Sequence, residues 1–363
     1  MEFFDGVNKN FGFGCMRMKM NGSEVDYDEF KNMIDTFLQA GFNYFDTAHG
    51  YIDGKSETAL RDCLVARHPR GSYILTNKLS PHHFEKEEDI RPLFRSQLEA
   101  CGVDYFDFYL MHSQNAKFFE KYKACRAYET ALELKAEGKI RHMGISFHDT
   151  AEVLDQILTE YPQIEVVQIQ FNYLDFEDEK VQSRKCYEVC RKHGKPVIVM
   201  EPVKGGKLAA LPEEAQKVLA DLGGGSAASY AIRFAAGFEG MMMVLSGMGD
   251  MAMVNDNLSY MKDFQPLSAE ERAAVDKVCA ILKAQDLIPC TNCRYCTEQC
   301  PMEIPIPSVL SALNTRKTFP GYNADPSGKL KEKAAACIGC GVCEGACPQN
   351  ISIREHLKQA EEL

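Results

Sequence analysis

Two cysteine runs near the end of the chain have the residue type and the spacing for metal chemistry. One reads CTNCRYCTEQCP from Cys290 and the other reads CIGCGVCEGACP from Cys337, so both follow the pattern C-x2-C-x2-C-x3-C-P. Three thiolates at this spacing can surround one iron–sulfur cluster, because each step turns the chain back toward the same face. A zinc ribbon uses two C-x2-C pairs, so a third cysteine in each run would be surplus. A disulfide framework is typical of exported chains, and nothing in the sequence indicates export.

The two runs together resemble a bacterial two-cluster ferredoxin over roughly 60 residues. In that family the fourth cysteine of each run ligates the cluster of the other run. The resemblance therefore implies two 4Fe-4S clusters with crossed ligands. The first cluster would be held by Cys290, Cys293, Cys296 and Cys347, and the second by Cys337, Cys340, Cys343 and Cys300.

Length, charge and composition limit the domain sizes, the partners and the location that the chain can have. Its 363 residues suffice for one large core and a small second one. A net charge of −11 without any basic block argues against a nucleic-acid partner. The N-terminal sequence MEFFDGVNKN lacks the features of a signal peptide, and no apolar run is long enough to span a membrane. The seven cysteines outside the runs are scattered, as reduced thiols would be, which predicts a cytoplasmic protein.

The chain from residue 11 to 260 alternates short apolar runs with amphipathic segments. Runs such as YILTNK and VIVMEP are apolar throughout, which is typical of parallel strands covered on both faces. Eight strand–helix units in about 250 residues indicate an α/β fold of the closed (β/α)8 type, a TIM barrel. An open doubly wound sheet is the alternative, but no G-x-G-x-x-G opens the first helix. The predicted strands are 11–15, 42–46, 73–78, 106–111, 140–145, 165–170, 196–201 and 241–246, and the predicted helices are 27–40, 56–67, 86–101, 121–137, 150–160, 178–193, 227–236 and 250–260.

Barrel enzymes place their chemistry where strands end. Asp46, Lys78 and His112 end three consecutive predicted strands, and Tyr51 lies in the loop after Asp46. Reduction of a carbonyl by hydride needs a proton donor at the developing alkoxide, and the Tyr51 hydroxyl could serve if Lys78 lowered its pKa. Asp46 would then hold the lysine, and His112 would orient the substrate oxygen. Taken one at a time, such residues are more often helix caps, solvated side chains or core residues.

This constellation resembles the aldo/keto reductase family over roughly residues 10 to 260. GFNYFDTAHGYIDGKSE matches the family signature around Asp46 and Tyr51, ILTNKL matches the lysine strand, FDFYLMHS the histidine strand, and RHMGIS the fifth strand. The resemblance implies that Tyr51 is the general acid and base, and that Asp46, Lys78 and His112 support it.

The same resemblance implies a dinucleotide site. The stretch SGMGDMAMVNDN, after the eighth predicted strand, has no basic residue to pair with the 2′-phosphate of NADP. This absence argues against NADPH and favours NADH, a flavin (FMN or FAD) or an empty site, and the choice between NAD(P)H and a flavin stays open. Backbone N–H groups from Ser246 to Gly249 could bind a phosphate, although a helix cap explains the same residues. The cofactor contacts implied are Ser146 and Gln168 for a carboxamide, Met200 beside the nicotinamide, Ser246 and Gly247 for phosphate, and Asn257 for adenine.

Domain boundaries follow from these patterns. We expect a barrel over 1–262, a connecting helix over 263–289 that opens with a capping box at Ser268 and Glu271, and a small, helical ferredoxin-like domain over 290–363. The segment 203–226 is long for a barrel loop and is either a lid with Lys204 or Lys207 near phosphates, or a surface loop.

Three functions are compatible with the two halves. The first is a reductase-type enzyme that acts on a small carbonyl or alcohol substrate and exchanges electrons with its clusters. Because hydride carries two electrons and each cluster accepts one, such coupling calls for a splitter such as a flavin. The second is an electron-transfer protein whose barrel binds a dinucleotide or flavin and docks a redox partner protein. In the third, the clusters only stabilise the C-terminal segment.

Overall fold

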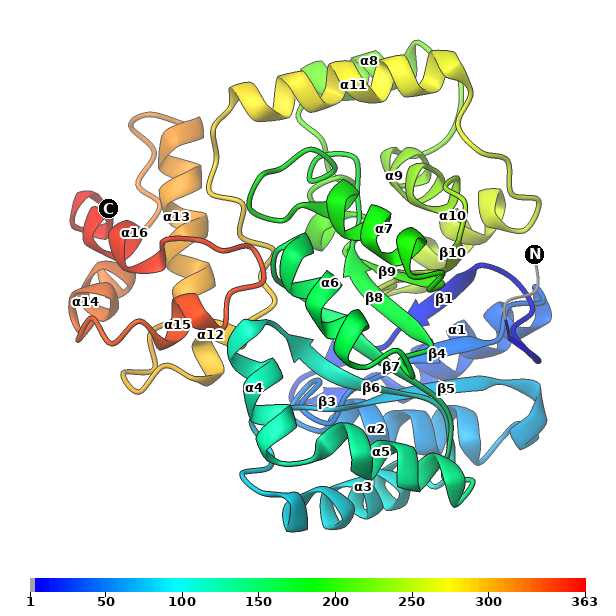
Figure 1. Cartoon of the computed structure of the whole chain (residues 1–363). Helices are drawn as coiled ribbons and strands as arrows, with labels where there is room; N and C mark the ends of the chain where they lie inside the picture. The colour runs from blue at the N-terminus through cyan, green and yellow to red at the C-terminus, as the bar shows by residue number, and fades with distance from the viewer. Residues whose placement is uncertain (1–3) are drawn as a thin grey trace.

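A closed barrel of eight parallel strands forms the larger part of the computed structural model, which describes residues 4–363 (Figure 1). The first strand pairs with both the last strand and the second barrel strand, so the sheet has no free edge. This closure confirms the (β/α)8 barrel and excludes the open sheet. The barrel order is β1 (Phe11–Gly14), β10 (Met241–Ser246), β9 (Val197–Met200), β8 (Val166–Gln170), β7 (Ile140–Phe147), β6 (Phe106–Gln114), β5 (Ile74–Leu79) and β4 (Tyr44–Asp46).

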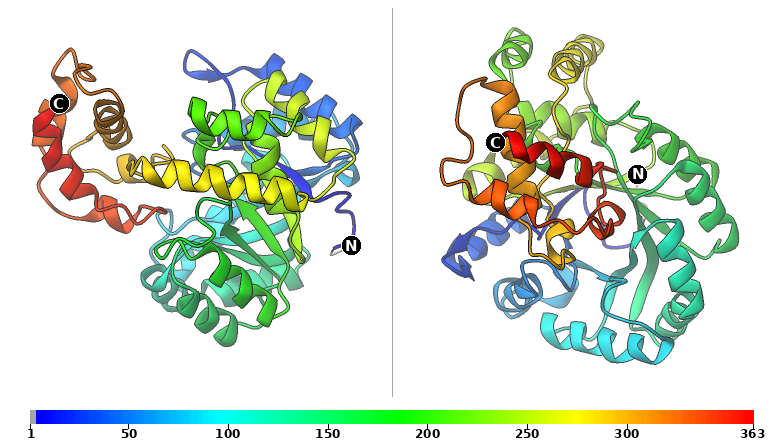
Figure 2. Two further views of the ribbon diagram at one scale, coloured as in Figure 1. Left: turned by 90° about the horizontal axis from the view of Figure 1, so that it is seen from above. Right: turned by 90° about the vertical axis from the view of Figure 1, so that its left-hand side faces the viewer.

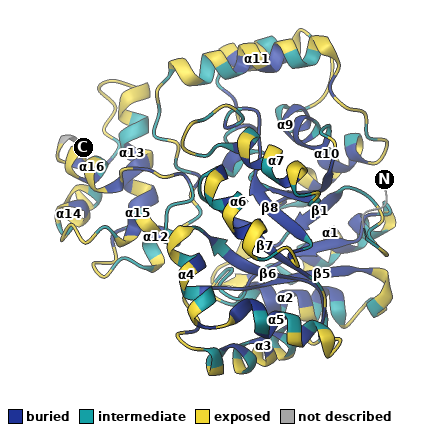
Figure 3. Cartoon of the chain, viewed as in Figure 1, coloured by how far each residue is buried: buried dark blue, intermediate teal, exposed yellow. Residues whose placement is uncertain are grey.

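Helices cover the outside of the barrel and leave the strands buried (Figure 3). Every residue of β5 and of β10 is buried, which explains why these strands read as continuous apolar runs. A short hairpin, β2 (Met20–Asn21) with β3 (Glu24–Val25), follows β1. The covering helices are α1 (Tyr27–Gln39), α2 (Lys55–Leu60), α3 (Glu87–Cys101), α4 (Ala116–Ala124), α5 (Ala127–Ala136), α6 (Ala151–Glu160), α7 (Ser183–Lys192), α8 (Glu213–Ala220), α9 (Ala227–Ala236) and α10 (Met251–Met261).

Three details differ from the sequence predictions. The helix predicted over 121–137 is two helices, α4 and α5, because Arg126 adopts a left-handed conformation with φ of 52°. The helix predicted from 178 begins at Ser183, since the Asp178 carboxylate instead holds a turn by accepting from two backbone N–H groups. The helix predicted to begin at residue 56 begins at Lys55, so Ser56 lies inside α2, and its hydroxyl donates to the Cys15 carbonyl.

The C-terminal region has a small hydrophobic core of its own. Ile306, Val309, Leu310 and Leu357 are buried together with proposed ligands of the clusters. The helix that precedes this region, α11 (Ala269–Ala284), opens with the predicted Ser268–Glu271 capping box and packs beside α8 on the barrel. The helices of the region are α12 (Tyr295–Glu298), α13 (Ile306–Thr318), α14 (Lys329–Ala335), α15 (Val342–Gly345) and α16 (Ile353–Gln359).

The C-terminal region lies over the end of the barrel at which the strands terminate (Figure 2). Arg17, in the loop after β1, donates to the Thr291 carbonyl at 2.9 Å. Gln349 donates to the Gln170 side chain, which ends β8, at 3.0 Å. The tightest approach is at Gly205, whose φ is +63° and whose position would bring an added Cβ within 2.5 Å of the Thr291 carbonyl oxygen. The cluster region therefore covers the mouth of the barrel.

Candidate active site and cluster-binding cysteines

The four predicted catalytic residues meet at the C-terminal end of the barrel. Lys78, on β5, is fully buried and donates from Nζ to Asp46 Oδ1 at 2.6 Å and to the Thr47 carbonyl at 2.7 Å. The same ammonium lies 3.3 Å from the Tyr51 hydroxyl oxygen. The His112 ring lies near the Tyr51 ring, with centroids 6.1 Å apart. A buried chain of contacts therefore runs from the carboxylate through the ammonium to the phenol.

Burial controls the charges at this site. It raises the pKa of Tyr51, and the Asp46 charge adds to the rise, so the prediction that Lys78 lowers the pKa of the phenol is wrong in its net direction. Burial likewise lowers the pKa of Lys78, although the adjacent Asp46 carboxylate opposes that fall. The Tyr51 hydroxyl is thus fully protonated at neutral pH, and a phenolate would form only while a proton is being given away.

His112 is held as a neutral imidazole. Burial and the nearby Lys78 lower its pKa well below the usual range. Its Nδ1 lies 2.7 Å from the Ser80 hydroxyl. When Ser80 donates to Nδ1, the ring proton must sit on Nε2, from where it can be donated to a substrate oxygen.

A cavity of about 630 Å³ opens onto this group. It extends from Tyr51 and His112 toward the N-terminus of α10, and its walls include the backbone of the loop after β10. A volume of this order is typical of a ligand site. His148 also lines it, and burial lowers the pKa of that imidazole to about 4.

Most of the predicted cofactor residues line this cavity. Gln168, Met200, Ser246, Gly247 and Asn257 do so. The Asn257 amide is already engaged, since it donates to Ser246 Oγ at 2.8 Å and accepts from the Tyr260 hydroxyl.

Ser146 differs from these residues. Its side chain is buried and accepts from the Ser113 backbone N–H at 2.9 Å, so it fixes the loop after His112.

The long loop after β9 binds the cluster region. Lys204, predicted near phosphates, is buried in an ion pair with Asp175 and donates to Gln349 at 2.8 Å, so its charge is neutralised. Lys207 donates to the Ile288 carbonyl at 2.9 Å. Both lysines therefore hold the two parts of the chain together, so the segment matches neither alternative for Lys204, a phosphate-binding lid or an exposed loop.

Two residues that line the cavity were not singled out from the sequence. Arg17 lines the cavity and follows the end of β1, so the rule that flagged Asp46, Lys78 and His112 would also have found it. Tyr295 lines the same cavity but comes from the cluster region. No local signal marks it, because its place depends on how the two parts dock.

The eight cysteines form two groups. We call Cys290, Cys293, Cys296 and Cys347 the proximal cysteine set, and Cys300, Cys337, Cys340 and Cys343 the distal cysteine set. In the proximal set Cys347 lies close enough to Cys290, Cys293 and Cys296 for their charges to interact, and Cys293 lines the large cavity.

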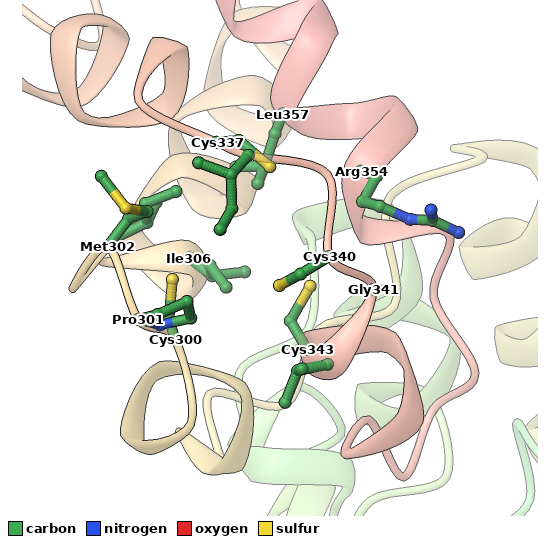
Figure 4. Close-up of a pocket in the computed structure, with 13 residues that line it drawn as sticks. Cys300, Pro301, Met302, Ile306, Cys337, Cys340, Gly341, Cys343, Arg354 and Leu357 are labelled. Carbon is green, nitrogen blue, oxygen red and sulfur yellow. The ribbon is translucent and has the colours of Figure 1, made fainter.

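The distal set surrounds a separate pocket. Its four cysteines line that pocket, and Figure 4 shows their sulfur atoms turned toward the same space. Cys300 thus lies with the second run, as crossed ligation requires. Across residues 4–363, no three His, Cys, Asp or Glu side chains are grouped so as to hold a single metal ion. A polynuclear cluster fits thiolates arranged around an open pocket better than zinc does.

Residues 10–280 match the aldo/keto reductase family. The chain belongs to that family. Residues 289–352 match a 4Fe-4S dicluster domain, so this aldo/keto reductase is an oxidoreductase with a domain for two iron–sulfur clusters. Among the described residues, no helix is both long and apolar enough to cross a membrane.

Curated relatives and solved structures agree with this assignment. An NADH-specific methylglyoxal reductase of Escherichia coli is 28% identical over 278 residues, 70% of this chain and 76% of that protein. An aldo-keto reductase of Mycolicibacterium vanbaalenii is 26% identical over 70% of this chain and 84% of its own. A Klebsiella pneumoniae aldo-keto reductase solved with NADPH superposes with a TM-score of 0.61 at 20% identity, over 75% of this chain and 95% of that one, which shows the shared barrel.

Proposed function

We propose that this aldo/keto reductase carries out carbonyl or alcohol redox chemistry at Tyr51 and exchanges single electrons through its two clusters. The observation that carries the proposal is one cavity lined both by Tyr51 and by Cys293 of the proximal cysteine set. A substrate bound against the Tyr51 hydroxyl would therefore lie beside a cluster ligand.

The chain's own residues account for proton transfer. A bound reduced nicotinamide would supply the hydride to the carbonyl carbon. Tyr51 then gives its proton to the carbonyl oxygen, and the Lys78 ammonium, 3.3 Å away, stabilises the phenolate left behind. Asp46 keeps Lys78 in place, and His112 donates from Nε2 to the same substrate oxygen.

The charges along the cavity favour NADH as the dinucleotide. Among the described residues that line it, Arg17 is the one Lys or Arg side chain, whereas Asp250, the N-cap of α10, and Asp256, in the middle of that helix, are acidic. A carboxylate can accept a hydrogen bond from a ribose 2′-hydroxyl but repels a 2′-phosphate. The name of the Escherichia coli relative, an NADH-specific methylglyoxal reductase, supports the same choice and a small carbonyl substrate.

The distal cysteine set provides a route to an external partner. Cys340 is exposed, and the exposed apolar side chains Met302, Ile338 and Val342 stand around the same pocket. Cys296 of the proximal set lies near enough to Cys343 of the distal set for their charges to interact. Electrons could therefore pass one at a time between the surface and the cavity, where a bound flavin would divide the two electrons of a hydride between the two clusters. This exposed rim also favours the second candidate, an electron carrier that reduces no carbonyl.

Anaerobically purified enzyme tests the proposal. Its organic cofactor should be extracted and identified, and its clusters should be followed by visible absorption while an alcohol or a small aldehyde is added with NADH or NAD. Tyr51→Phe should lower turnover of that substrate by about 100-fold or more, with iron content and NADH binding unchanged. Full turnover by the Tyr51→Phe variant would rule out the enzyme and leave the electron carrier. Clusters that never change redox state during turnover would rule out the coupling, and an extracted flavin would replace NADH as the resident cofactor.

A further inference from the structure

A second cavity meets the catalytic cavity at Tyr51. It has a volume of about 1070 Å³ and lies between the barrel loops after β4 and β5 and the cluster region. Tyr51, His112 and His148 line both cavities, whereas Gln168 and Asn257, implied as contacts of a dinucleotide, line only the first. The residues common to both cavities therefore surround the place where a substrate that enters through the second cavity would meet the cofactor.

A chain of buried hydrogen bonds leads from the cluster region to the His148 ring. The Lys204 ammonium can only donate, so Gln349 Oε1 accepts from it at 2.8 Å. The Gln349 amide nitrogen then donates to Gln170 Oε1 at 3.0 Å. The Gln170 amide nitrogen donates to the Pro348 carbonyl at 3.0 Å and to His148 Nδ1 at 3.2 Å. Because an ammonium only donates and a carbonyl only accepts, the direction of every bond in the chain is fixed.

This chain also fixes the position of the His148 proton. An amide nitrogen is only a donor, so Nδ1 must accept with its lone pair and the ring carries its proton on Nε2. Within residues 4–363, Nε2 forms no hydrogen bond, and the ring lines both cavities. His148 thus presents a free N–H donor where the two cavities meet, and the turn that follows Cys347 sets the orientation of that donor.

We propose that His148 is a substrate-binding residue that donates from Nε2 to a second oxygen of the substrate, on the carbon next to the reacting carbonyl. This role rests on the proposed function, in which Tyr51 and His112 contact the oxygen of the reacting carbonyl. The substrate class is then carbonyl compounds with a vicinal oxygen, such as 1,2-dicarbonyl compounds.

The reaction of such a pair of carbonyls is a single two-electron reduction. One carbonyl accepts the hydride of the reduced nicotinamide at its carbon and the Tyr51 proton at its oxygen. The products are an α-hydroxy carbonyl compound and the oxidised nicotinamide, and the carbonyl bound to His148 is unchanged. A hydrogen bond to that second carbonyl draws electrons from the neighbouring carbon and so favours hydride attack there.

A pair of aldehydes tests this role of His148 in the cluster-loaded enzyme. 2-Oxopropanal and propanal share one carbon chain and differ by the second oxygen, so the ratio of their kcat/KM values measures how well that oxygen is bound. His148→Leu should lower this ratio by about three- to tenfold through the loss of one hydrogen bond. His148→Gln keeps an N–H donor and a carbonyl that can accept from Gln170, so it should restore part of the ratio. His83→Leu removes a histidine that lines only the second cavity and should leave the ratio at the wild-type value.

Gln170 is a positioning residue in this scheme, because it acts on the substrate through His148. Gln170→Leu should lower the same ratio, since the proton of His148 is then no longer confined to Nε2. The double variant with His148→Leu should show the ratio of His148→Leu alone, because the two changes interrupt one chain of contacts. Gln170→Leu also provides the test if His148→Leu fails to assemble its clusters.

The outcomes separate this inference from the proposed function. An unchanged ratio in His148→Leu and in Gln170→Leu, with iron content at the wild-type value, would overturn the inference while Tyr51→Phe stays inactive with both aldehydes. An equal fall of the ratio in His83→Leu would also overturn it, because the shape of the cavity would then account for the effect. If Tyr51→Phe is fully active with both aldehydes, the proposed function fails, and the role of His148 fails with it.

Discussion

The proximal and distal cysteine sets share one sequence pattern but have different surroundings. Cys293 of the proximal set lines the cavity that contains Tyr51, whereas Cys340 of the distal set is exposed beside Ile338, which is 65% exposed. Identical ligand spacing thus yields one site that faces the chemistry and one that faces solvent. The difference teaches that docking onto the barrel, rather than the cysteine motif, determines the surroundings of each cysteine set.

Removing one crossed cysteine from each set is expected to have the largest effect. Cys347→Ser should abolish the proximal cluster, because the fourth ligand of each cluster comes from the other run. Since the proximal set lies between the cavity and the distal set, substrate-driven reduction of the distal cluster should be lost as well. Cys300→Ser should abolish only the distal cluster. Each variant should lose roughly half of its iron. Iron and sulfide analysis with electron paramagnetic resonance of the reduced protein measures both changes.

Crossed ligation fails if Cys300→Ser loses the cluster next to it in sequence, held by Cys290, Cys293 and Cys296. Cys279→Ser is a suitable control, because this cysteine lies on α11 and outside both sets.

A charge added at the exposed rim of the distal pocket should affect electron exchange with a partner without affecting carbonyl reduction in the cavity. Ile338→Glu would place a carboxylate beside the distal pocket and should slow electron exchange with an external one-electron carrier by about tenfold, because a desolvated charge disfavours close docking. The rate of carbonyl reduction with NADH should not change, because that reaction takes place in the cavity beside the proximal cysteine set. Stopped-flow mixing with a small redox protein measures the first rate, and steady-state assay measures the second.

Phe319→Glu is the matched control for this experiment. Phe319 is 61% exposed and lies in the same domain but away from the distal pocket. If both variants slow exchange equally, general charge rather than the rim around Cys340 controls docking.

A smaller effect is expected from acid, which should lower the stability of the folded protein through His148 in the cavity. His148 lines the catalytic cavity, and burial lowers its pKa to about 4 from the usual 6.5. Between these values the unfolded chain binds a proton that the folded chain does not, so stability falls as the pH is lowered from 6.5 toward 4. The melting temperature of His148→Gln should therefore depend less on pH over this window, with a difference of a few degrees. His356→Gln, at an exposed position, should keep the wild-type slope.

The barrel and the grouping of the candidate catalytic residues could be predicted because one rule covers both. Strand ends meet at one mouth of a closed parallel barrel, so Asp46, Lys78 and His112 were brought together by topology alone. The cluster motif of the two cysteine runs could also be predicted, since the spacing of the ligands within each run is a local feature of the sequence. The α4–α5 break was not, because no glycine or proline stands at Arg126.

The position of the cluster domain could not be predicted. It depends on contacts between segments far apart in the chain, such as Arg17 with Thr291 and Lys204 with Gln349. The sequence left Lys204 between a lid near phosphates and a surface loop, because an exposed lysine and a buried, ion-paired one look alike in sequence. It also took the Lys78 charge as the main influence on Tyr51, whereas burial outweighs it in the folded protein.

Gly205 limits how this architecture can be rearranged. Any side chain at this position would collide with the Thr291 carbonyl oxygen, and its φ of +63° is disfavoured for other residues. A ferredoxin-like module grafted onto another reductase barrel would therefore sit flush only if the recipient loop kept this gap. In a recipient with alanine or a larger residue there, the grafted module could not pack against the mouth of the barrel. The cavity and the clusters would then lie in two domains connected only by a linker.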